Sequence, residues 1–321
     1  MSTPYHRAAV TLRHARAVVV CGHVRPDGDA VGAVLGLTLA LREAGIPAVP
    51  TLADAGSEPP ATYAFLPGFA LYTQLGDLEQ PDVFVALDTP NLDRLGDAAA
   101  LAGAAENLIV IDHHPDNAEF GTVNVVDSSA AASGQLVWRL LDRLEVRPSP
   151  EVALCCYVGL MTDTGRFQYD NTSPDALRDA ASMLEHGVSA SEASRLVYQE
   201  RSAGSLRLQA LAMSRIEVVN DGRVAWSWIG DQDFVAARAR REEAEYLPDA
   251  VREIGGVEVV VLLRQVDGEV RGNLRAKTGY DVGSVARDFG GGGHTAAAGF
   301  TWTGTIDDLL PKLLAKLPGS R

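Results

Sequence analysis

The stretch LIVIDHHPD, residues 108–116, sets four apolar residues directly before Asp112, His113 and His114. A short, continuous apolar run of this kind is typical of a strand buried on both faces of a parallel sheet. Carboxylates and imidazoles are also the side chains that bind metal ions and transfer protons. The stretch therefore predicts an α/β fold and marks the edge of the sheet where ligands bind.

The same pattern predicts four more strands in the first half of the chain. They are expected at 17–22 (AVVVCG), 47–52 (PAVPTL), 82–88 (DVFVALD) and 122–127 (TVNVVD). Helical patterns alternate with these strands and then dominate, and they predict helices at about 29–44, 91–103, 130–145, 150–162 and 174–186. This rhythm predicts an α/β domain with a mainly parallel sheet flanked by helices.

The last third of the chain changes to a hairpin pattern. Two strand pairs turn at Asp221–Gly222 and at Asp267–Gly268, which are dipeptides favoured in tight turns. Residues 188–210, which precede these pairs, are small, polar and compatible with a helix. We therefore expect a first domain at 1–187, a helical linker at 188–210 and a smaller α+β domain at 211–321.

The composition limits the classes of partner. With 28 basic and 42 acidic residues the formal net charge is −14, so the chain as a whole repels a long duplex and an anionic membrane. The sequence shows no secretory signal and no span-length apolar segment, so we expect a cytoplasmic protein. Its three cysteines lie in apolar surroundings and are expected to be free thiols.

Several carboxylates and imidazoles are expected to converge at one sheet edge, because the ends of neighbouring parallel strands lie side by side. These residues are His23, Asp27, Asp29, Asp88, Asp112, His113, His114 and Asp163. So many buried carboxylates repel one another unless positive charge compensates them. The mixed oxygen and nitrogen donors favour Mn²⁺, with Fe, Co or Zn as alternatives, and their number favours two ions. Such a pair of ions is suited to phosphoester hydrolysis. A single strand-end Asp is usually a helix cap, and only the joint pattern makes the metal site the better interpretation.

These motifs resemble those of the DHH phosphoesterase family. The stretch FGGGGHTAAAGF, residues 289–300, is similar to the glycine-rich signature of the DHH-associated domain that follows in that family. The resemblance covers nearly the whole chain. The length and the single short linker resemble the NrnA-type oligoribonucleases (nano-RNases), which are also phosphatases of 3′-phosphoadenosine 5′-phosphate (pAp) and include relatives that cleave cyclic di-AMP.

The resemblance implies a role for each residue of the first domain. It implies one Mn²⁺ held by His23, Asp27 and Asp88, and a second held by Asp29, Asp88, His113 and Asp163, with Mg²⁺, Co²⁺ or Fe²⁺ as alternatives. His114 would stay free of metal and act on the scissile phosphate. Asp112 would orient a neighbouring imidazole.

The second domain is expected to bind the substrate. Strand alternation places Arg271, Asn273, Arg275 and Lys277 on one face, which is therefore cationic. Gly290–Gly293 are expected to expose backbone N–H groups as an anion-binding nest beside His294. From the similar face of relatives, the expected substrate-binding residues are Asn273, Arg275, Gly291, Gly292, Gly293 and His294. Arg166, which follows Asp163 in the first domain, is a further candidate for contact with a base, and ordinary core packing is the alternative.

The implied activity is Mn²⁺-dependent hydrolysis of short RNA or DNA oligonucleotides of two to five nucleotides. Linear dinucleotides such as pApA, pAp and cyclic di-AMP are further expected substrates, and a homodimer is an alternative to a monomer. Three other functions stay open: a single-strand DNA exonuclease, an inorganic pyrophosphatase and a non-catalytic nucleotide sensor. A dinucleotide-binding Rossmann enzyme is excluded, because CGHVRPDGDAVG lacks the G-x-G-x-x-G turn.

Overall fold

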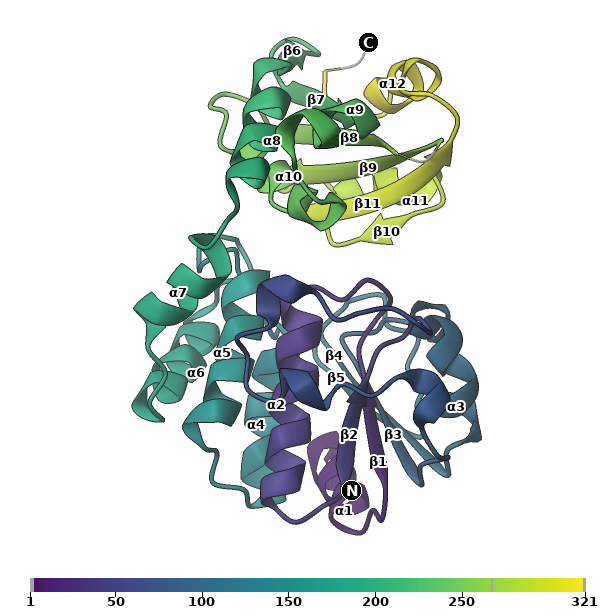
Figure 1. Cartoon of the computed structure of the whole chain (residues 1–321), viewed down its shortest axis with the longest axis vertical. Helices are drawn as coiled ribbons and strands as arrows, with labels where there is room; N and C mark the ends of the chain where they lie inside the picture. Colours follow the sequence, from purple (N-terminus) through teal and green to yellow (C-terminus); the bar gives the residue numbers. More distant parts are fainter. Residues whose placement is uncertain (1–2, 267, 320–321) are drawn as a thin grey trace. The chain divides into compact units, whose positions relative to one another are not determined.

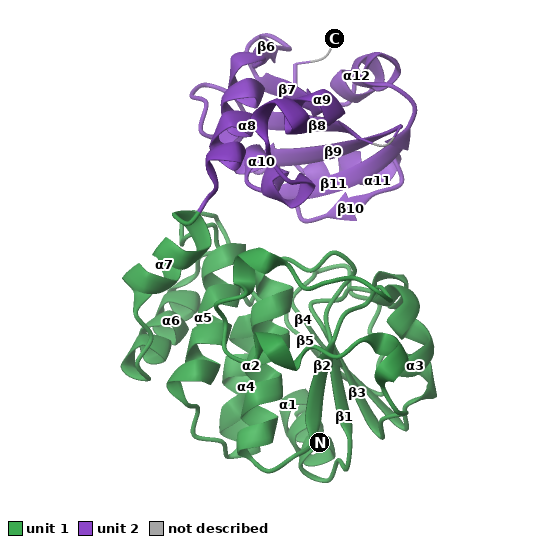
Figure 2. Ribbon diagram, viewed as in Figure 1, with its two compact units in different colours: residues 1–200 green, residues 201–321 purple. Residues whose placement is uncertain are grey.

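The computed structural model describes residues 3–266 and 268–319. The chain divides into two compact units, residues 1–200 and 201–321 (Figures 1 and 2). The division falls inside the expected linker at 188–210, which contains one helix in unit 1 and the first two turns of another in unit 2. None of the helices in the described ranges is long and apolar enough to cross a membrane.

Unit 1 is built on a five-stranded sheet in the order β2-β1-β3-β4-β5. All neighbouring strands are parallel, as predicted. The strands are β1 (Val18–Cys21), β2 (Ala48–Thr51), β3 (Val83–Leu87), β4 (Asn107–Asp112) and β5 (Val123–Val126). β1 and β3 are buried at every position, because helices cover both faces of the sheet.

The described part of unit 1 contains seven α-helices. They are α1 (Pro4–Arg13), α2 (Gly28–Glu43), α3 (Ala99–Ala104), α4 (Ser133–Leu144), α5 (Pro150–Asp163), α6 (Pro174–Glu185) and α7 (Ala190–Tyr198). Short 3-10 helices lie at η1 (Ala61–Tyr63), η2 (Phe69–Leu71), η3 (Leu75–Asp77) and η4 (Leu92–Ala98). The predicted continuous helix at about 91–103 was wrong. Its first part is η4, because Gly96 has φ 49 and ψ −130 and breaks the helical run before α3.

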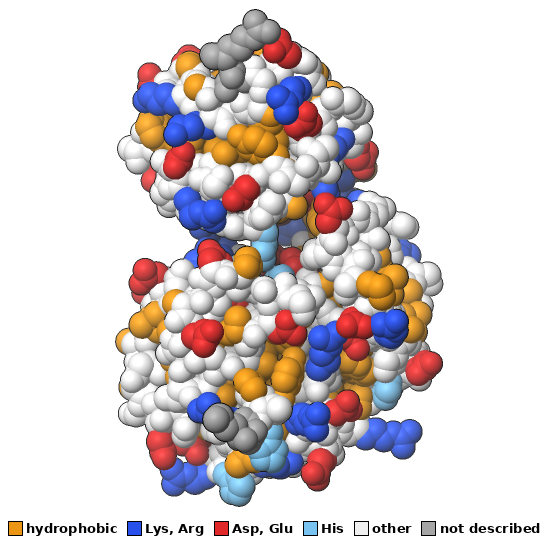
Figure 3. Space-filling model, turned by 180° about the vertical axis from the view of Figure 1, so that it is seen from behind, with side chains coloured by type: hydrophobic (Ala, Val, Ile, Leu, Met, Phe, Trp, Pro, Cys, Tyr) orange, Lys and Arg blue, Asp and Glu red, His pale blue; other side chains and the backbone are white. Residues whose placement is uncertain are grey.

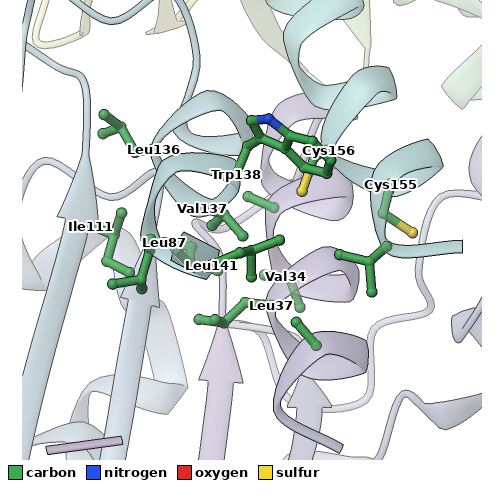
Figure 4. Close-up of a cluster of buried hydrophobic side chains, with 14 of the residues drawn as sticks. Val34, Leu37, Leu87, Ile111, Leu136, Val137, Trp138, Leu141, Cys155 and Cys156 are labelled. Atoms are coloured by element: carbon green, nitrogen blue, oxygen red, sulfur yellow. The ribbon is translucent and has the colours of Figure 1, made fainter. Parts of the chain in front are cut away.

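The larger core of unit 1 lies on the face of the sheet covered by α1, α2, α4 and α5. Figure 4 shows side chains of α2, α4 and α5 gathered above Leu87 and Ile111 of the central strands. The helices α2 and α5 touch through their backbones. A Cβ on Gly32 would lie 2.5 Å from the carbonyl oxygen of Cys155. The cysteines of the described chain are buried free thiols, as predicted.

Unit 2 is a smaller α+β unit with a mixed six-stranded sheet in the order β10-β11-β9-β8-β7-β6. Among the strand pairs of the described residues of this unit, β7–β8 is parallel and the others are antiparallel. The strands are β6 (Glu217–Val219), β7 (Val224–Gly230), β8 (Val259–Val266), β9 (Glu269–Ala276), β10 (Gly292–Gly293) and β11 (Ala297–Thr303). The helices are α8 (Ala203–Ser214), α9 (Asp231–Ala237), η5 (Arg241–Ala244), α10 (Leu247–Arg252), α11 (Val282–Asp288) and α12 (Ile306–Leu314).

Two hydrophobic clusters cover the two faces of this second sheet, one formed with α8–α10 and the other with α11 and α12. The predicted hairpin at Asp221–Gly222 is confirmed, since β6 and β7 are antiparallel and both turn residues have positive φ. Strands β8 and β9 are also antiparallel. Asp267, the first residue of the turn predicted between them, lies outside the described residues.

Candidate metal centre

The polar residues predicted for unit 1 follow three neighbouring strands. The register pairs Cys21 of β1 with Ala86 of β3, and Leu87 of β3 with Ile111 of β4, so the three strands end at the same level. The strand ends lead into His23, Asp88 and the Asp112–His114 segment, respectively. Asp27 and Asp29 lie at the start of α2, and Asp163 ends α5.

Asp88 lies between two histidines and faces each with a different oxygen. Its Oδ2 atom is 3.4 Å from Nε2 of His23, and its Oδ1 atom is 3.4 Å from Nε2 of His113. The residue is 2% exposed and has φ 54, a left-handed conformation that Asp adopts more readily than most residues. An unfavourable backbone conformation at a buried carboxylate indicates a functional constraint.

The first group of donor atoms contains His23, Asp27 and Asp88. Nε2 of His23 lies 3.8 Å from Oδ1 of Asp27. The Oδ1 atom of Asp27 also accepts the N–H groups of Asp29 and Ala30, so Asp27 is the N-cap of α2. Nδ1 of His23 is 2.8 Å from the carbonyl oxygen of Val24, so a proton on Nδ1 can be donated there while Nε2 faces the carboxylates.

The second group contains Asp29, His113 and Asp163. Nε2 of His113 is 3.4 Å from Oδ2 of Asp163 and 3.9 Å from Oδ2 of Asp29. The donor atoms within each group lie within 4.8 Å of one another, and Asp88 contacts the histidine of both groups. This is the arrangement expected for two cations that share one carboxylate.

The ionisation of these groups reflects a local excess of negative charge. Burial lowers the pKa of His23, but its hydrogen bonds to Asp27 and Asp88 outweigh burial and raise it to about 10. Burial raises the pKa of Asp163 to about 7. Burial and the neighbouring Asp88 raise the pKa of Asp29 well above its usual range. The cluster thus attracts positive charge, and its oxygen and imidazole donors fit a pair of divalent cations.

His114 makes contacts different from those of His113. Its Nδ1 atom is 2.8 Å from Oδ1 of Asp112, which also accepts the backbone N–H groups of His113 and His114. The other oxygen of Asp112 accepts the side-chain amide of Asn117 at 2.6 Å. Burial lowers the pKa of His114, but the hydrogen bond to Asp112 outweighs burial and raises it. Asp112, which is fully buried, therefore orients His114 and favours its protonated form.

The predictions for unit 1 did not include four polar residues that support these ligands. They are Arg94, Asn117, Ser133 and Asn171. Nη2 of Arg94 lies 3.1 Å from Nδ1 of His23, and Asn171 donates to the carbonyl oxygen of Asp163 at 3.1 Å. The sequence marks Ser133 only as a residue near a helix start, and the others carry no pattern that distinguishes them from surface loop residues.

Arg166 follows Asp163 in a turn with an unfavourable backbone. Gly165, Arg166 and Phe167 have consecutive positive φ values of 54, 65 and 62. The Arg166 guanidinium lies 4.7 Å from the ring centre of Tyr198, at the end of α7. This contact gives Arg166 a defined position within unit 1, while its role in substrate binding stays a prediction.

Strand β9 of unit 2 shows the predicted alternation. Arg271 is exposed and Asn273 and Arg275 are partly buried, whereas the residues between them are buried. Nε of Arg275 lies 3.1 Å from Oδ1 of Asp249, and the Lys277 ammonium contacts the carbonyl oxygen of Ile254. The cationic face is therefore partly neutralised by its own unit.

The glycine-rich segment of unit 2 differs in part from the expected nest. Gly290 and Gly291 donate their N–H groups to the carbonyl oxygens of Arg287 and Ala286, and so close the end of α11. The expectation that these two amides are exposed donors was wrong. Gly292 and Gly293 form the short strand β10, and a Cβ on Gly291 would lie 2.1 Å from the carbonyl oxygen of Gly299. The glycines thus permit close backbone packing, and substrate binding by Gly291–Gly293 and His294 stays a prediction.

The net charge of the chain is concentrated in unit 1. That unit contains 12 basic and 26 acidic residues, 12 − 26 = −14, whereas unit 2 contains 16 of each. On the face seen in Figure 3, acidic and basic side chains are interspersed. An anionic substrate would therefore be repelled by unit 1 unless local cations bound it.

The comparisons with known proteins agree with this geometry. Residues 17–160 match the N-terminal domain of the DHH family, and residues 230–318 match the DHHA1 domain. The chain is 33% identical over 289 residues to the bifunctional oligoribonuclease and PAP phosphatase NrnA of Thermus thermophilus, covering 89% of this chain and 84% of that protein. The chain belongs to the DHH family.

Other DHH-family proteins are similar over most of the chain. The NrnA protein of Bacillus subtilis is 28% identical over 89% of this chain and 90% of its own length. A solved exopolyphosphatase-related protein from Bacteroides fragilis shares the fold with a TM-score of 0.88, at 24% identity over 98% of this chain and 94% of that one. The predicted fold class and the resemblance to this family are thus confirmed.

Proposed function

We propose that this DHH-family chain is a hydrolase that uses two Mn²⁺ ions to cleave short oligoribonucleotides and linear dinucleotides to mononucleotides, and to remove the 3′-phosphate of pAp. The observation that carries the proposal is the position of Asp88 between His23 and His113, with one oxygen toward each. The names of the NrnA relatives support the choice of substrates. Mg²⁺, Co²⁺ or Fe²⁺ in place of Mn²⁺ are alternatives that the donor set also fits.

The proposed site residues of unit 1 divide into metal ligands and one proton donor. His23, Asp27 and Asp88 would hold one cation, and Asp29, Asp88, His113 and Asp163 the other. When bound, such cations lower the pKa of a coordinated water and offset negative charge on a phosphoryl group. The orientation of both histidines supports this role, because Nε2 of His23 and Nε2 of His113 each face Asp88.

His114 would act on the substrate. Asp112 holds Nδ1 of His114, and Nε2 of the same ring is proposed to donate a proton to the leaving oxygen. Burial lowers the pKa of His114, but the hydrogen bond to Asp112 outweighs burial and raises it, which favours the protonated imidazole. Removing the side chain of Asp112 or Asn117 would therefore lower the rate of turnover, because His114 would no longer be held in its orientation.

Arg275, Asn273, Gly291, Gly292, Gly293 and His294 of unit 2, with Arg166 of unit 1, are proposed to bind the substrate. The negative charge of unit 1 supports this division, since anion recognition then depends on the cations and on unit 2. The same charge disfavours long nucleic acids and so supports short substrates. Cleavage of cyclic di-AMP, a cytoplasmic location and a homodimer stay predictions.

The test is a substrate panel with purified protein. We expect hydrolysis of pApA, two- to five-nucleotide RNA and pAp, dependent on added Mn²⁺ and abolished by EDTA. A ten-nucleotide DNA strand and pyrophosphate separate the exonuclease and pyrophosphatase alternatives. Cyclic di-AMP tests the further substrate. Tight binding of pApA without turnover in any divalent metal would instead support a nucleotide sensor and contradict the proposal.

A further inference from the structure

The N-terminus of α4 lacks a cap from its own loop. Its N-cap residue is Ala132, whose side chain cannot accept a hydrogen bond. The carboxylate of Asp29 takes this place from α2, more than 100 residues earlier in the chain. Its Oδ2 atom accepts the N–H of Ser133 at 2.6 Å, and its Oδ1 atom accepts the N–H of Gly134 at 2.8 Å. Helix and carboxylate thus satisfy each other, and the dipole of α4 favours the negative charge.

The same residue of α4 reaches a second carboxylate. The Ser133 hydroxyl lies 3.2 Å from Oδ1 of Asp88, the oxygen that faces His113. Ser133, Asp29 and Asp88 are each at most 2% exposed, so no bulk water replaces these bonds. One residue therefore holds both Asp29 and the shared carboxylate, one through its N–H and the other through its hydroxyl.

The first turn of α4 and its surroundings leave no free space around Asp29. A Cβ on Gly134 would lie 3.1 Å from Oδ1 of Asp29, and one on Gly159 would lie 2.6 Å from the same atom. The preceding loop is also fixed, because the N–H of Ala131 donates to Oε1 of Gln135. The carboxylate of Asp29 consequently has one position.

We propose that Ser133 is a positioning residue for the second cation, the one assigned to Asp29, Asp88, His113 and Asp163. It fixes the direction of two of the four ligands before a cation binds, and the first turn of α4 supports it. Ser133 is fully buried and would act through these two carboxylates, not on the substrate itself. This inference rests on the proposed two-metal function.

The test is a calorimetric titration of metal-free full-length protein with Mn²⁺. Wild type is expected to bind two ions. Ser133→Ala removes the hydroxyl bond to Asp88 and keeps the N–H bond to Asp29. It should weaken one of the two binding steps about 10-fold, the usual effect of removing an outer-shell partner. Raising the Mn²⁺ concentration should restore turnover of pApA, because the substrate contacts are unchanged.

Gly134→Ala provides a second variant, because its methyl group presses on Oδ1 of Asp29, and it should weaken the same step. Ser129→Ala and Gly103→Ala are the matched controls and should bind Mn²⁺ like wild type, since Ser129 is exposed and Gly103 has open space around it. Melting temperatures in EDTA check that each variant folds. Wild-type affinity in both Ser133→Ala and Gly134→Ala overturns the inference, whereas a wild-type protein that binds no Mn²⁺ overturns the proposed function itself.

Discussion

Nδ1 of His114 lies 2.8 Å from Oδ1 of Asp112, and Nε2 of the adjacent His113 faces Asp88, Asp29 and Asp163. The two neighbouring imidazoles thus use different nitrogens, and Nδ1 of His114 also lies 3.6 Å from Oδ1 of Asp88. The backbone N–H groups of both histidines converge on the same oxygen of Asp112, which fixes the turn in which the two rings diverge. Under the proposed function, His113 would bind metal and His114 would transfer a proton, and the first prediction tests this division.

His114→Ala should retain two Mn²⁺ ions and lose turnover. Because His114 would supply the proton for the leaving oxygen, kcat for pApA should fall by about 10²–10⁴-fold. Calorimetry gives the stoichiometry of Mn²⁺ and steady-state assays give kcat. The control is His186→Ala, whose ring bonds the carbonyl oxygen of Ser182 at the end of α6. Loss of Mn²⁺ from His114→Ala, or an unchanged kcat, would show that this role is misassigned.

Asn117→Ala should lower kcat without a change in KM. The side-chain amide of Asn117 donates to Oδ2 of Asp112 and to the carbonyl oxygen of Thr89. It thus links Asp112, which orients His114, to the loop after β3. Loss of such an outer partner typically costs about 10-fold in activity. The kcat and KM for pApA distinguish the outcomes. A rise in KM alone would mean that Asn117 contacts substrate instead.

The fold and the convergence of these acidic and histidine side chains could be predicted because both depend on local patterns, while their assignment as metal ligands stays a prediction. Strands β1, β3 and β4 are apolar runs, and parallel neighbours end at one edge, so His23, Asp88 and His113 could be placed together before any coordinates were known. The positions of the residues that support this site could not be predicted from the sequence. Ser133 meets Asp29 across more than 100 residues, and no local pattern records a contact of that range.

The other differences between prediction and structure come from the backbone conformation of single glycines. Gly96 divides the predicted helix at about 91–103 because it adopts φ 49. The glycines after α11 look like an exposed nest in the sequence, but Gly290 and Gly291 direct their N–H groups back to the helix end. In both places a glycine permitted several conformations, and tertiary packing selected one.

Gly32→Ala should destabilise unit 1. A Cβ at this position would lie 2.5 Å from the carbonyl oxygen of Cys155, so α2 and α5 would have to separate. We expect a loss of about 1–3 kcal/mol in the free energy of unfolding, as for other overpacked cores. Urea unfolding measures it. Gly103→Ala on α3 has no heavy atom near its Cβ and should instead stabilise by about 0.5–1 kcal/mol. Equal urea midpoints for Gly32→Ala and Gly103→Ala would contradict the close contact between α2 and α5.

Arg275→Ala should weaken substrate binding and leave kcat nearly unchanged. A hydrogen bond from a charged donor contributes about 1.5–3 kcal/mol, so KM for pApA should rise by about 10- to 100-fold. Asp249 loses its ion-pair partner in this variant, but its side chain is 39% exposed and can be hydrated. We therefore expect only a small loss of folding stability. Arg287→Ala on α11 is the control, since Arg287 pairs with Asp281 at the N-cap of the same helix and both side chains are exposed. An unchanged KM would remove Arg275 from the substrate site.

Asp233→Asn should make unit 2 less stable in a pH-dependent way. Two hydrogen bonds, of 2.6 and 2.7 Å, join Asp233 to Arg215, and they hold the pKa of this carboxyl below its usual range. A lowered pKa in the folded state stabilises the protein above the unfolded pKa of about 3.9, and this stabilisation is lost as the pH falls through the folded value. Wild type should therefore exceed Asp233→Asn by about 1–3 kcal/mol at pH 7, and the difference should shrink below about pH 4.

Tryptophan fluorescence in urea can follow this difference, because Trp226, Trp228 and Trp302 lie in unit 2 and only Trp138 lies in unit 1. Glu258→Gln is the matched control. Glu258 pairs with Arg223 at the solvent-exposed surface, where the ion pair is screened. The urea midpoint of Glu258→Gln should therefore stay close to that of wild type. If the difference between wild type and Asp233→Asn were the same at pH 7 and pH 3, ionisation of Asp233 would not be the source of the stability. The pair with Arg215 would then act through packing alone.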